Sequence, residues 1–186
     1  MTKKQESWLV AGIVLLALVL DQVSKVYIKT HFEVGEAREV LSWFWIAFVE
    51  NNGMAFGIEW FSKLLLTLFR IVAVGVLSWY IHTMIHKQTV RTGYLVTIAM
   101  VVAGALGNII DCVFYGKIWG YAGWFHGRVV DMLYFPLIRN AAGECLFFRP
   151  VFNIADSFIT VAVILILLFY RKDLDESLNK IFPKKD

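Results

Sequence analysis

The stretch YLVTIAMVVAGALGNIIDCVFY, residues 94–115, decides the fold, because it has the length and apolar character of a membrane span. A helix needs about 20 mostly apolar residues to cross a bilayer. Near its end, Asn108 and Asp111 stand three residues apart, which places both side chains on one face of a helix. A charged side chain at the bilayer centre costs roughly 2.5–3.5 kcal/mol. We therefore predict a membrane helix with a functional polar site near one end.

The same pattern of amide and carboxylate returns in FNIAD, residues 152–156, at the start of another apolar stretch. The composition agrees with a membrane protein, since 59% of the residues are hydrophobic and the mean hydropathy is +0.64. We predict one membrane domain, residues 1–186, of the all-α class, with a bundle of four transmembrane helices. These helices are expected at about residues 8–28, 64–85, 94–115 and 152–170, and an aromatic, β-branched segment at 40–49 indicates strands.

The charges set the expected orientation and exclude one class of partner. The net charge of +3 comes mainly from the termini and one short loop, so the sequence gives no reason to expect nucleic-acid binding. No A-x-A cleavage site follows the first apolar run, so we expect it to stay as a helix. Short basic flanks favour the cytoplasmic side, which predicts that both termini are cytoplasmic and that 30–62 and 116–150 lie outside. The basic residues on the expected inner side are Lys3, Lys4, Lys87, Arg91, Arg171, Lys172, Lys180, Lys184 and Lys185.

With this topology, four carboxylates reach the same depth near the outer surface: Asp21, Asp111, Asp131 and Asp156. Two neighbouring carboxylates cannot both ionise cheaply, so they share one proton. An aspartic protease uses this arrangement to activate water and to protonate the substrate carbonyl. Structural roles are the alternative, because Asp156 could cap a helix and Asp21 could pair with Lys25 one helical turn away.

Two other functions fit parts of the pattern. Membrane acids also form proton relays, so a small proton-coupled transporter component is an alternative. A non-enzymatic anchoring subunit, in which the acids are helix caps, is another. Against the transporter, the acids gather at one depth, and no pair of interrupted spans indicates inverted repeats. Cys112 and Cys145 have no metal-binding spacing, which argues against a metal enzyme.

Five motifs in order give the chain a resemblance to a known family. They are Asp21-Gln22-x-x-Lys25, Asn51-x-Gly53-x-Ala55-Phe56, Gly107-Asn108-x-x-Asp111, Val129-Val130-Asp131 and Phe152-Asn153-x-Ala155-Asp156. The chain resembles lipoprotein signal peptidase (signal peptidase II), a bacterial membrane aspartic protease. The resemblance covers most of residues 21–158.

The resemblance implies a catalytic dyad of Asp131 and Asp156. It also implies a group of substrate-binding or site-supporting residues, namely Asp21, Lys25, Asn51, Gly53, Asn108, Asp111 and Asn153. The implied substrate is a prolipoprotein that carries a diacylglyceryl group on a cysteine, cleaved just before that cysteine without metal or organic cofactor. The implied fold adds a small extracytoplasmic β-sheet and a mobile flap. The expected location is the bacterial cytoplasmic (inner) membrane among its lipids, and we expect a monomer.

The chain departs from the family pattern in two ways. Cys112 stands where the family usually has an arginine, and Arg128 is a candidate to compensate for it. Additional residues occur at 116–128 and 134–150. Both cysteines are expected on the outer side, where a disulfide is allowed but not required. Arg70, inside the second span, either snorkels to headgroups or pairs with a site acid.

Overall fold

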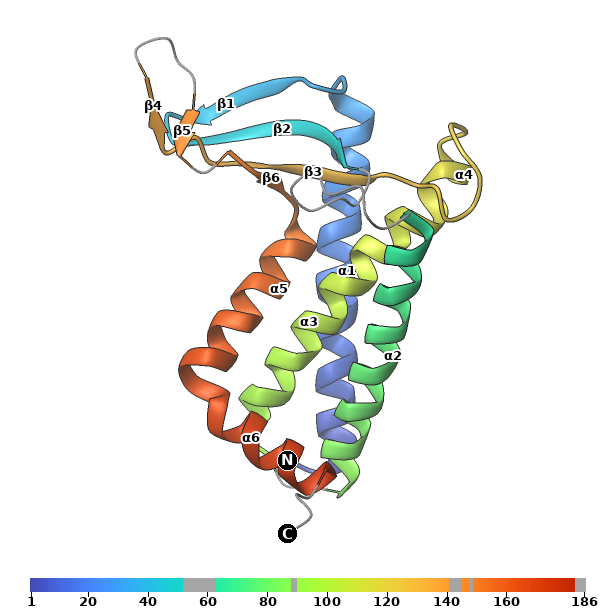
Figure 1. Cartoon of the computed structure of the whole chain (residues 1–186), viewed down its shortest axis with the longest axis vertical. Coiled ribbons are helices and arrows are strands. Elements are labelled where there is room, and N and C mark those ends of the chain that lie inside the picture. Colours follow the sequence, from blue (N-terminus) through green and yellow to red (C-terminus); the bar gives the residue numbers. More distant parts are fainter. Residues whose placement is uncertain (52–62, 88–89, 141–144, 148, 183–186) are drawn as a thin grey trace.

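The computed structural model is mostly helical, with four long apolar helices and a small antiparallel sheet (Figure 1), which is consistent with the predicted membrane protein. Three of them include the whole of a predicted stretch, and the fourth begins at Ile154, two residues after the predicted start, because Val151–Phe152 form a strand. The helices long and apolar enough to cross a membrane are Lys3–His31, Lys63–Lys87, Thr92–Ile118 and Ile154–Ile181. The structure describes residues 1–51, 63–87, 90–140, 145–147 and 149–182.

Two of the four helices are interrupted by a wider π-helical turn. The elements in chain order are α1 (Lys3–His31), α2 (Lys63–Lys87), α3 (Thr92–Ile110), η1 (Asp111–Tyr115), α4 (Gly116–Ile118), α5 (Ile154–Leu165), η2 (Ile166–Tyr170) and α6 (Arg171–Ile181). Such π turns are rare and are frequent at functional sites. The first one begins at Asp111, one of the predicted site residues.

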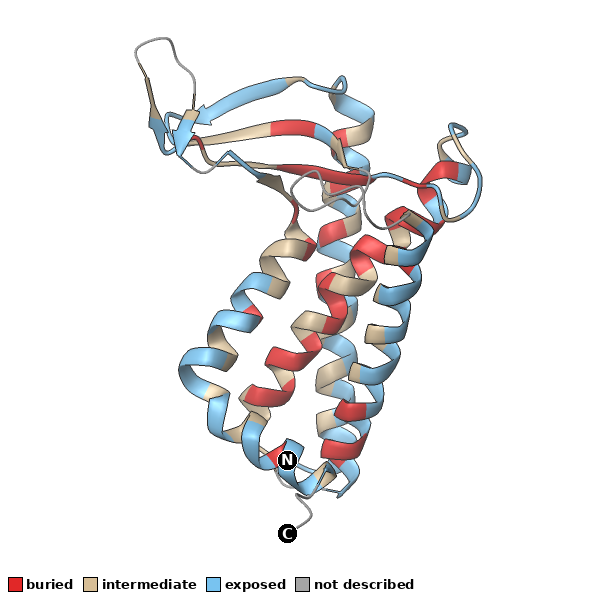
Figure 2. Cartoon of the chain, in the orientation of Figure 1, coloured by how far each residue is buried: buried red, intermediate tan, exposed pale blue. Residues whose placement is uncertain are grey.

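Helix α3 is the central helix of the four. In the apolar part of Thr92–Ile118, the span that contains α3, 67% of the residues are buried. In the apolar part of Ile154–Ile181 the share is 11% (Figure 2). It packs against α1, α2 and α5. Close packing requires Gly104, because a Cβ there would lie 2.4 Å from the Ala155 carbonyl oxygen. The outward faces expose apolar residues such as Leu15 and Leu16, as expected for helices in lipid.

The sheet lies across one end of the helices, which we call the sheet end (Figure 1). Its strand order is β1-β2-β3-β6, with every pair antiparallel. Its strands are β1 (Ala37–Leu41), β2 (Phe44–Asn51), β3 (Val129–Tyr134) and β6 (Val151–Phe152), and a separate pair consists of β4 (Ile138–Arg139) and β5 (Cys145–Phe147). Strands in the 40–49 region were predicted, whereas β3 was not. The sequence motif with Asp131 thus lies in the sheet.

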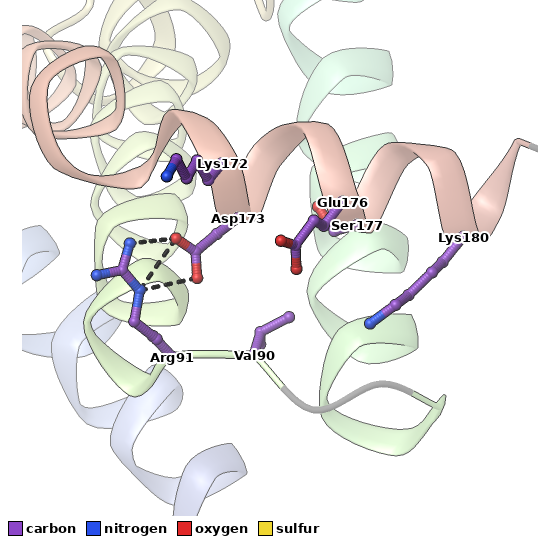
Figure 3. Close-up of a pocket in the computed structure, with 7 residues that line it drawn as sticks. All are labelled: Val90, Arg91, Lys172, Asp173, Glu176, Ser177 and Lys180. Atoms are coloured by element: carbon purple, nitrogen blue, oxygen red, sulfur yellow. Dashed lines mark hydrogen bonds and ion pairs between the residues drawn. The ribbon is translucent and has the colours of Figure 1, made fainter.

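The opposite end of the helices, which holds the start of α1 and the end of α6, is the terminal end (Figure 1). A cavity of about 490 Å³ lies there between α6 and the segment before α3. Figure 3 shows Arg91 and Asp173 paired at this cavity. Nearby, the Tyr80 hydroxyl makes hydrogen bonds to the hydroxyls of Tyr94 and Ser177, so these buried groups satisfy one another.

Candidate active site

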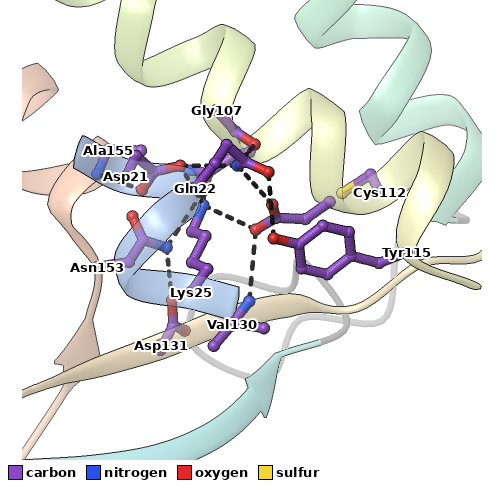
Figure 4. Close-up of polar contacts among 12 residues, drawn as sticks. Asp21, Gln22, Lys25, Gly107, Cys112, Tyr115, Val130, Asp131, Asn153 and Ala155 are labelled. Atoms are coloured by element: carbon purple, nitrogen blue, oxygen red, sulfur yellow. Dashed lines mark hydrogen bonds and ion pairs between the residues drawn. The ribbon is translucent and has the colours of Figure 1, made fainter. Parts of the chain in front are cut away.

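The predicted polar residues meet at the sheet end in one buried network (Figure 4). Helix α1, the α3–η1 junction, strand β3 and the start of α5 each contribute to it. Its fully or nearly fully buried polar members are Asp21, Lys25, Asn108, Asp111, Asp131 and Asn153. Asn51, at the end of β2, and Asp156, in the first turn of α5, complete the set. Residues far apart in the sequence are therefore neighbours, as the motifs predicted.

Lys25 is the cation at the centre of the network. Its Nζ lies 2.8 Å from Asp21 Oδ2 and 2.7 Å from Asp111 Oδ2, and it donates a hydrogen bond to Asn108 Oδ1 at 3.0 Å. An ammonium has three protons, so all of its donors are used. The side chain has no exposed surface. Buried charges persist only when they are paired and hydrogen-bonded, and Lys25 meets both conditions.

Gln22 ties the two acids of this triad together. Its Nε2 donates to Asp21 Oδ2 and to Asp111 Oδ1, each at 3.0 Å, while the Tyr115 hydroxyl donates to its Oε1 at 3.1 Å. Asp21 Oδ1 also accepts the backbone N–H of Ala155 at 2.9 Å, at the start of α5. The Asp21–Lys25 pair, weighed above as a structural alternative, is thus part of the site and fixes α1 against α5.

Gly107 makes this close approach of α1 and α3 feasible. A Cβ at this position would lie 2.5 Å from Asp21 Oδ2, a distance at which the carboxylate would have to move. A glycine in a helix interior is otherwise unfavourable by about 1 kcal/mol relative to alanine. The glycine of the Gly107-Asn108-x-x-Asp111 motif therefore has a packing reason of its own.

The hydrogen bonds set the direction in which two side-chain amides point. Asn108 Oδ1 accepts from Lys25 and from Asn153 Nδ2, so its amino group faces Asp156 and donates to Oδ1 at 2.8 Å. Asn153 Oδ1 accepts the backbone N–H of Asp156 at 2.9 Å, so its amino group donates to Asp131 Oδ1 at 2.7 Å. Amide orientation is assigned from such networks. The carboxylates of Asp131 and Asp156 thus each receive an amide donor.

The cap of α5 differs from one of the alternatives considered above. Asn153, and not Asp156, is the N-cap residue of this helix, and its side chain accepts from the Asp156 backbone N–H. Asp156 lies three residues further on, in the first turn of α5, where its carboxylate accepts from Asn108. The carboxylate of Asp156 is therefore not used as the helix cap.

Asp131 is a buried acid with an unusual pKa. Its Oδ2 accepts from Asn51 at 3.0 Å and its Oδ1 from Asn153. Burial raises the pKa of Asp131 to about 7, and the nearby Asp156 charge adds to the rise, against the opposing effects of the two amides and Lys25. A carboxylic acid with this pKa can exchange a proton near neutral pH.

The four acids therefore fall into two classes. Asp21 and Asp111 are both ion-paired with Lys25. Within the described part of the chain, Asp131 and Asp156 form no ion pair and are held by amides alone. Two carboxylates that act on each other without a neutralising cation can share a proton, and this is the property that acid–base catalysis on water and a carbonyl group needs.

An apolar groove of about 940 Å³ runs beside the network between α1 and the sheet. Leu20 and Val23 of α1 line one side, and Met132 and Leu133, which follow Asp131 in β3, line the other. Ile154, between Asn153 and Asp156 in the first turn of α5, also contributes. The groove thus joins an apolar surface to the segments that carry both unpaired acids.

Arg128, one of the predicted site residues, forms its ion pair outside this network. Arg128 binds Glu50 at 2.8 Å. The guanidinium beside Cys112 is that of Arg70, whose Nη1 donates to Sγ at 3.5 Å, so Arg70 contacts the residue that follows a site acid. Cys112 and Cys145 do not form a disulfide with each other. Gly53, and with it the expected flap, lies outside the described residues.

Comparisons with known proteins show the family of this chain. A model of the signal peptidase (SPase) II family matches residues 13–171. The chain is 44% identical to the lipoprotein signal peptidase of Porphyromonas gingivalis, over 87% of this chain and 82% of that protein. The chain belongs to the signal peptidase II family. It is therefore a member of a peptidase family and a multi-pass membrane protein.

Further relatives show that the similarity to signal peptidase II is broad. The lipoprotein signal peptidase of Streptococcus pneumoniae is 33% identical, over 89% of this chain and 94% of that protein. A solved structure titled as a bacterial membrane enzyme is 31% identical, with a TM-score of 0.66 over 95% of this chain and 93% of that one. Sequence and fold therefore agree over nearly the whole length.

Proposed function

We propose that this signal peptidase II family member is an aspartic endopeptidase with Asp131 and Asp156 as its catalytic dyad. One observation carries the proposal: these two acids share one buried network, yet they lack the cation that neutralises Asp21 and Asp111. A merely structural site gives no reason to bury an acid such as Asp131 without a counter-charge, because burial of an unpaired charge is costly.

The raised pKa of Asp131 suggests how the dyad divides its work. In this division Asp131 holds the shared proton, and the side chain of Asp156 acts as the base. Asp156 takes a proton from water as the water oxygen attacks the scissile carbonyl carbon, while Asp131 gives its proton to the carbonyl oxygen. When the tetrahedral intermediate collapses, Asp156 protonates the leaving nitrogen and Asp131 recovers its proton from the hydroxyl.

The substrate that fits best is a prolipoprotein whose cysteine carries a diacylglyceryl group, cleaved just before that cysteine. The names of the relatives support a lipoprotein precursor. The apolar groove beside Met132 and Leu133 offers a surface of the right chemistry for acyl chains, within reach of the strand that carries Asp131. No cofactor is required by this chemistry.

The proposed setting is the bacterial inner membrane, with the sheet end outside and both termini in the cytoplasm. The terminal end carries basic residues on short flanks, including Lys3, Lys87, Arg91 and Lys172, and such residues favour the cytoplasmic side. The site then lies near the outer surface of the membrane, where a lipid-modified precursor emerges. We propose that the chain acts as a monomer.

A gel-shift assay in detergent or lipid tests this function with a diacylglyceryl-modified prolipoprotein. We expect cleavage by wild type and loss of cleavage in Asp131→Asn and Asp156→Asn, which keep side-chain size and remove the acid. The control is Asp175→Asn, the same change at an exposed acid of α6, which should cleave as wild type does.

If the two dyad variants cleave at the wild-type rate, the dyad assignment is wrong. If folded wild type leaves the substrate intact, the peptidase proposal fails, and proton flux in vesicles becomes the test of the transporter alternative.

A further inference from the structure

A second charged cluster lies beside the active site and is separate from the Lys25 triad. Its centre is Glu50, the residue before Asn51 in β2. Glu50 Oε1 lies 2.5 Å from Lys29 Nζ of α1, and its Oε2 lies 2.8 Å from Nη1 of Arg128, just before β3. We call these three residues the strand clamp. One carboxylate thus connects a membrane helix to the adjoining ends of two strands.

The strand clamp is largely shielded from water. The side chains of Lys29 and Glu50 are 7% and 9% exposed, and only Arg128 is half exposed, at 48%. Burial alone would raise the pKa of Glu50, but hydrogen bonds from Lys29 and Arg128 hold it below its ordinary value. Glu50 is therefore charged at neutral pH. Removal of one partner from a shielded pair leaves an uncompensated buried charge, whereas the loss of an exposed surface pair changes little.

Aromatic rings fix the cation of Lys29 in place. Its Nζ lies 5.4, 5.2 and 5.3 Å from the ring centroids of Phe48, Trp119 and Tyr121. The Tyr121 hydroxyl accepts the backbone N–H of Arg128 at 2.7 Å. Such cation–ring contacts stabilise a desolvated ammonium. The clamp consequently holds the 119–128 segment, which contains the additional residues noted in the sequence, against α1 and β2.

The clamp adjoins the contacts that hold Asp131. In the β2–β3 ladder Glu50 pairs with Val130 and Asn51 pairs with Val129, which makes Asn51 and Asp131 diagonal neighbours. The Asn51 amide donates to Asp131 at 3.0 Å. Glu50 of the clamp is therefore the neighbour of Asn51 in β2. Arg128 of the clamp lies three residues before Asp131, at the start of the segment that forms β3. A shift of about 1 Å is enough to break such a hydrogen bond and to misplace a reacting group.

We propose that Glu50 is a positioning residue for the peptidase reaction, acting through the β2–β3 ladder on the Asn51–Asp131 contact. Glu50 touches neither the substrate nor water in the reaction. It draws Lys29 and Arg128 to one carboxylate and so fixes the strand ends relative to α1. The inference rests on the proposed dyad, because the residue that it positions is Asp131.

The test compares Glu50→Gln with Glu36→Gln. Glu36 also binds an arginine, Arg38, beside the same sheet. That pair is much more exposed, since the side chain of Arg38 is 54% exposed and that of Glu36 is 31% exposed. For folded enzyme at matched concentration, we expect Glu50→Gln to lower kcat at least tenfold and to change KM less than threefold. We also expect faster amide hydrogen exchange over 129–131. Glu36→Gln should leave all three quantities unchanged.

Two further measurements separate positioning from a general loss of stability. The pH profile of Glu50→Gln should shift relative to wild type, because a weaker Asn51 contact changes the pKa of Asp131, whereas a purely structural defect lowers only the amount of active enzyme. Arg128→Lys, which keeps the charge, should retain most of the rate that Arg128→Gln loses.

The inference would be overturned if Glu50→Gln had the same kcat, pH profile and hydrogen exchange as the wild type. The inference would also be overturned if Glu50→Gln only lowered the fraction of folded enzyme and left the turnover per folded molecule normal. Failure of the proposed function looks different, since wild type would then not cleave or Asp131→Asn would remain active.

Discussion

The two ends of the helical part bury polar side chains in different ways. At the terminal end, Tyr80, Tyr94 and Ser177 are neutral and satisfy one another through their hydroxyls. At the sheet end, five charged or acidic groups lie together, and only part of their charge is neutralised. Both arrangements obey the rule that buried polar groups find partners. Among the buried acids of the described residues, Asp131 at the sheet end is the one without an ion pair, and this difference separates a structural contact from a candidate active site.

The cavities show the same contrast. The cavity at the terminal end is lined by charged residues of α6, and its Arg91–Asp173 pair lies at the surface, with the arginine 59% exposed (Figure 3). The groove at the sheet end is apolar and borders the strand that carries Asp131. A charged, open cavity suits contact with water and headgroups, whereas an apolar groove beside acids suits a lipid-modified substrate.

The largest effect on stability should come from Lys25→Met. This change leaves Asp21 and Asp111 buried without their cation, and removal of one partner from a buried ion pair costs about 3–5 kcal/mol. The measurement is the free energy of unfolding in mixed detergent micelles. Lys180→Met, at an exposed lysine of the terminal end, is the matched control and should change it by less than about 0.5 kcal/mol. If the two substitutions lowered the free energy of unfolding equally, Lys25 would not be the essential cation of a buried network.

The pH dependence should report Asp131. Its pKa of about 7 lies above the ordinary 3.8, so the folded chain keeps a proton that the unfolded chain releases between these values. The stability contribution of Asp131 therefore falls as the pH rises from about 4 to 7. The cleavage rate should also fall above pH 7, approaching tenfold per unit, as Asp131 loses the proton that it donates. A rate that is constant from pH 6 to 9 would be inconsistent with this role.

The smallest effect should come from the terminal end. Tyr80→Phe removes a hydroxyl that bonds to Tyr94 and Ser177, and a lost hydrogen bond of this kind costs about 1 kcal/mol. Cleavage per folded molecule should stay at the wild-type level, because these groups are far along the helices from the acids. The measurement pairs thermal unfolding with the cleavage assay. A loss of turnover without a loss of stability would show that the two ends are coupled.

Much of the fold and of the site could be predicted from the sequence. The four spans follow from apolar length alone, and the acids stand out because charge is costly in such stretches. The structure brings Asp21, Asn108, Asp111, Asp131 and Asn153 into one buried network, as the motifs indicated. Each motif fixes the spacing of its own residues, and the expected topology of the spans brings the motifs to one depth.

Other features depend on tertiary packing and could not be predicted. Strand β3 was missed because Val129-Val130-Asp131-Met132-Leu133 does not alternate and is buried almost throughout. The contact of Tyr115 with Gln22 depends on how η1 turns toward α1, and no local signal indicates it. The approach of Arg70 to Cys112 is likewise a product of the packing of α2 on α3.

The central claim is that Asp131 and Asp156 act as one unit. The most direct measurement is the single-turnover cleavage rate of Asp131→Asn, Asp156→Asn and the double variant on a diacylglyceryl-modified prolipoprotein. Residues that act as a unit lose nearly all of their joint effect when either is removed. We predict that each single variant falls to the residual rate of the double variant. If each single variant kept part of the rate, and the rate reduction in the double variant equalled the product of the two single reductions, the two acids would act independently. That result would contradict a shared catalytic dyad.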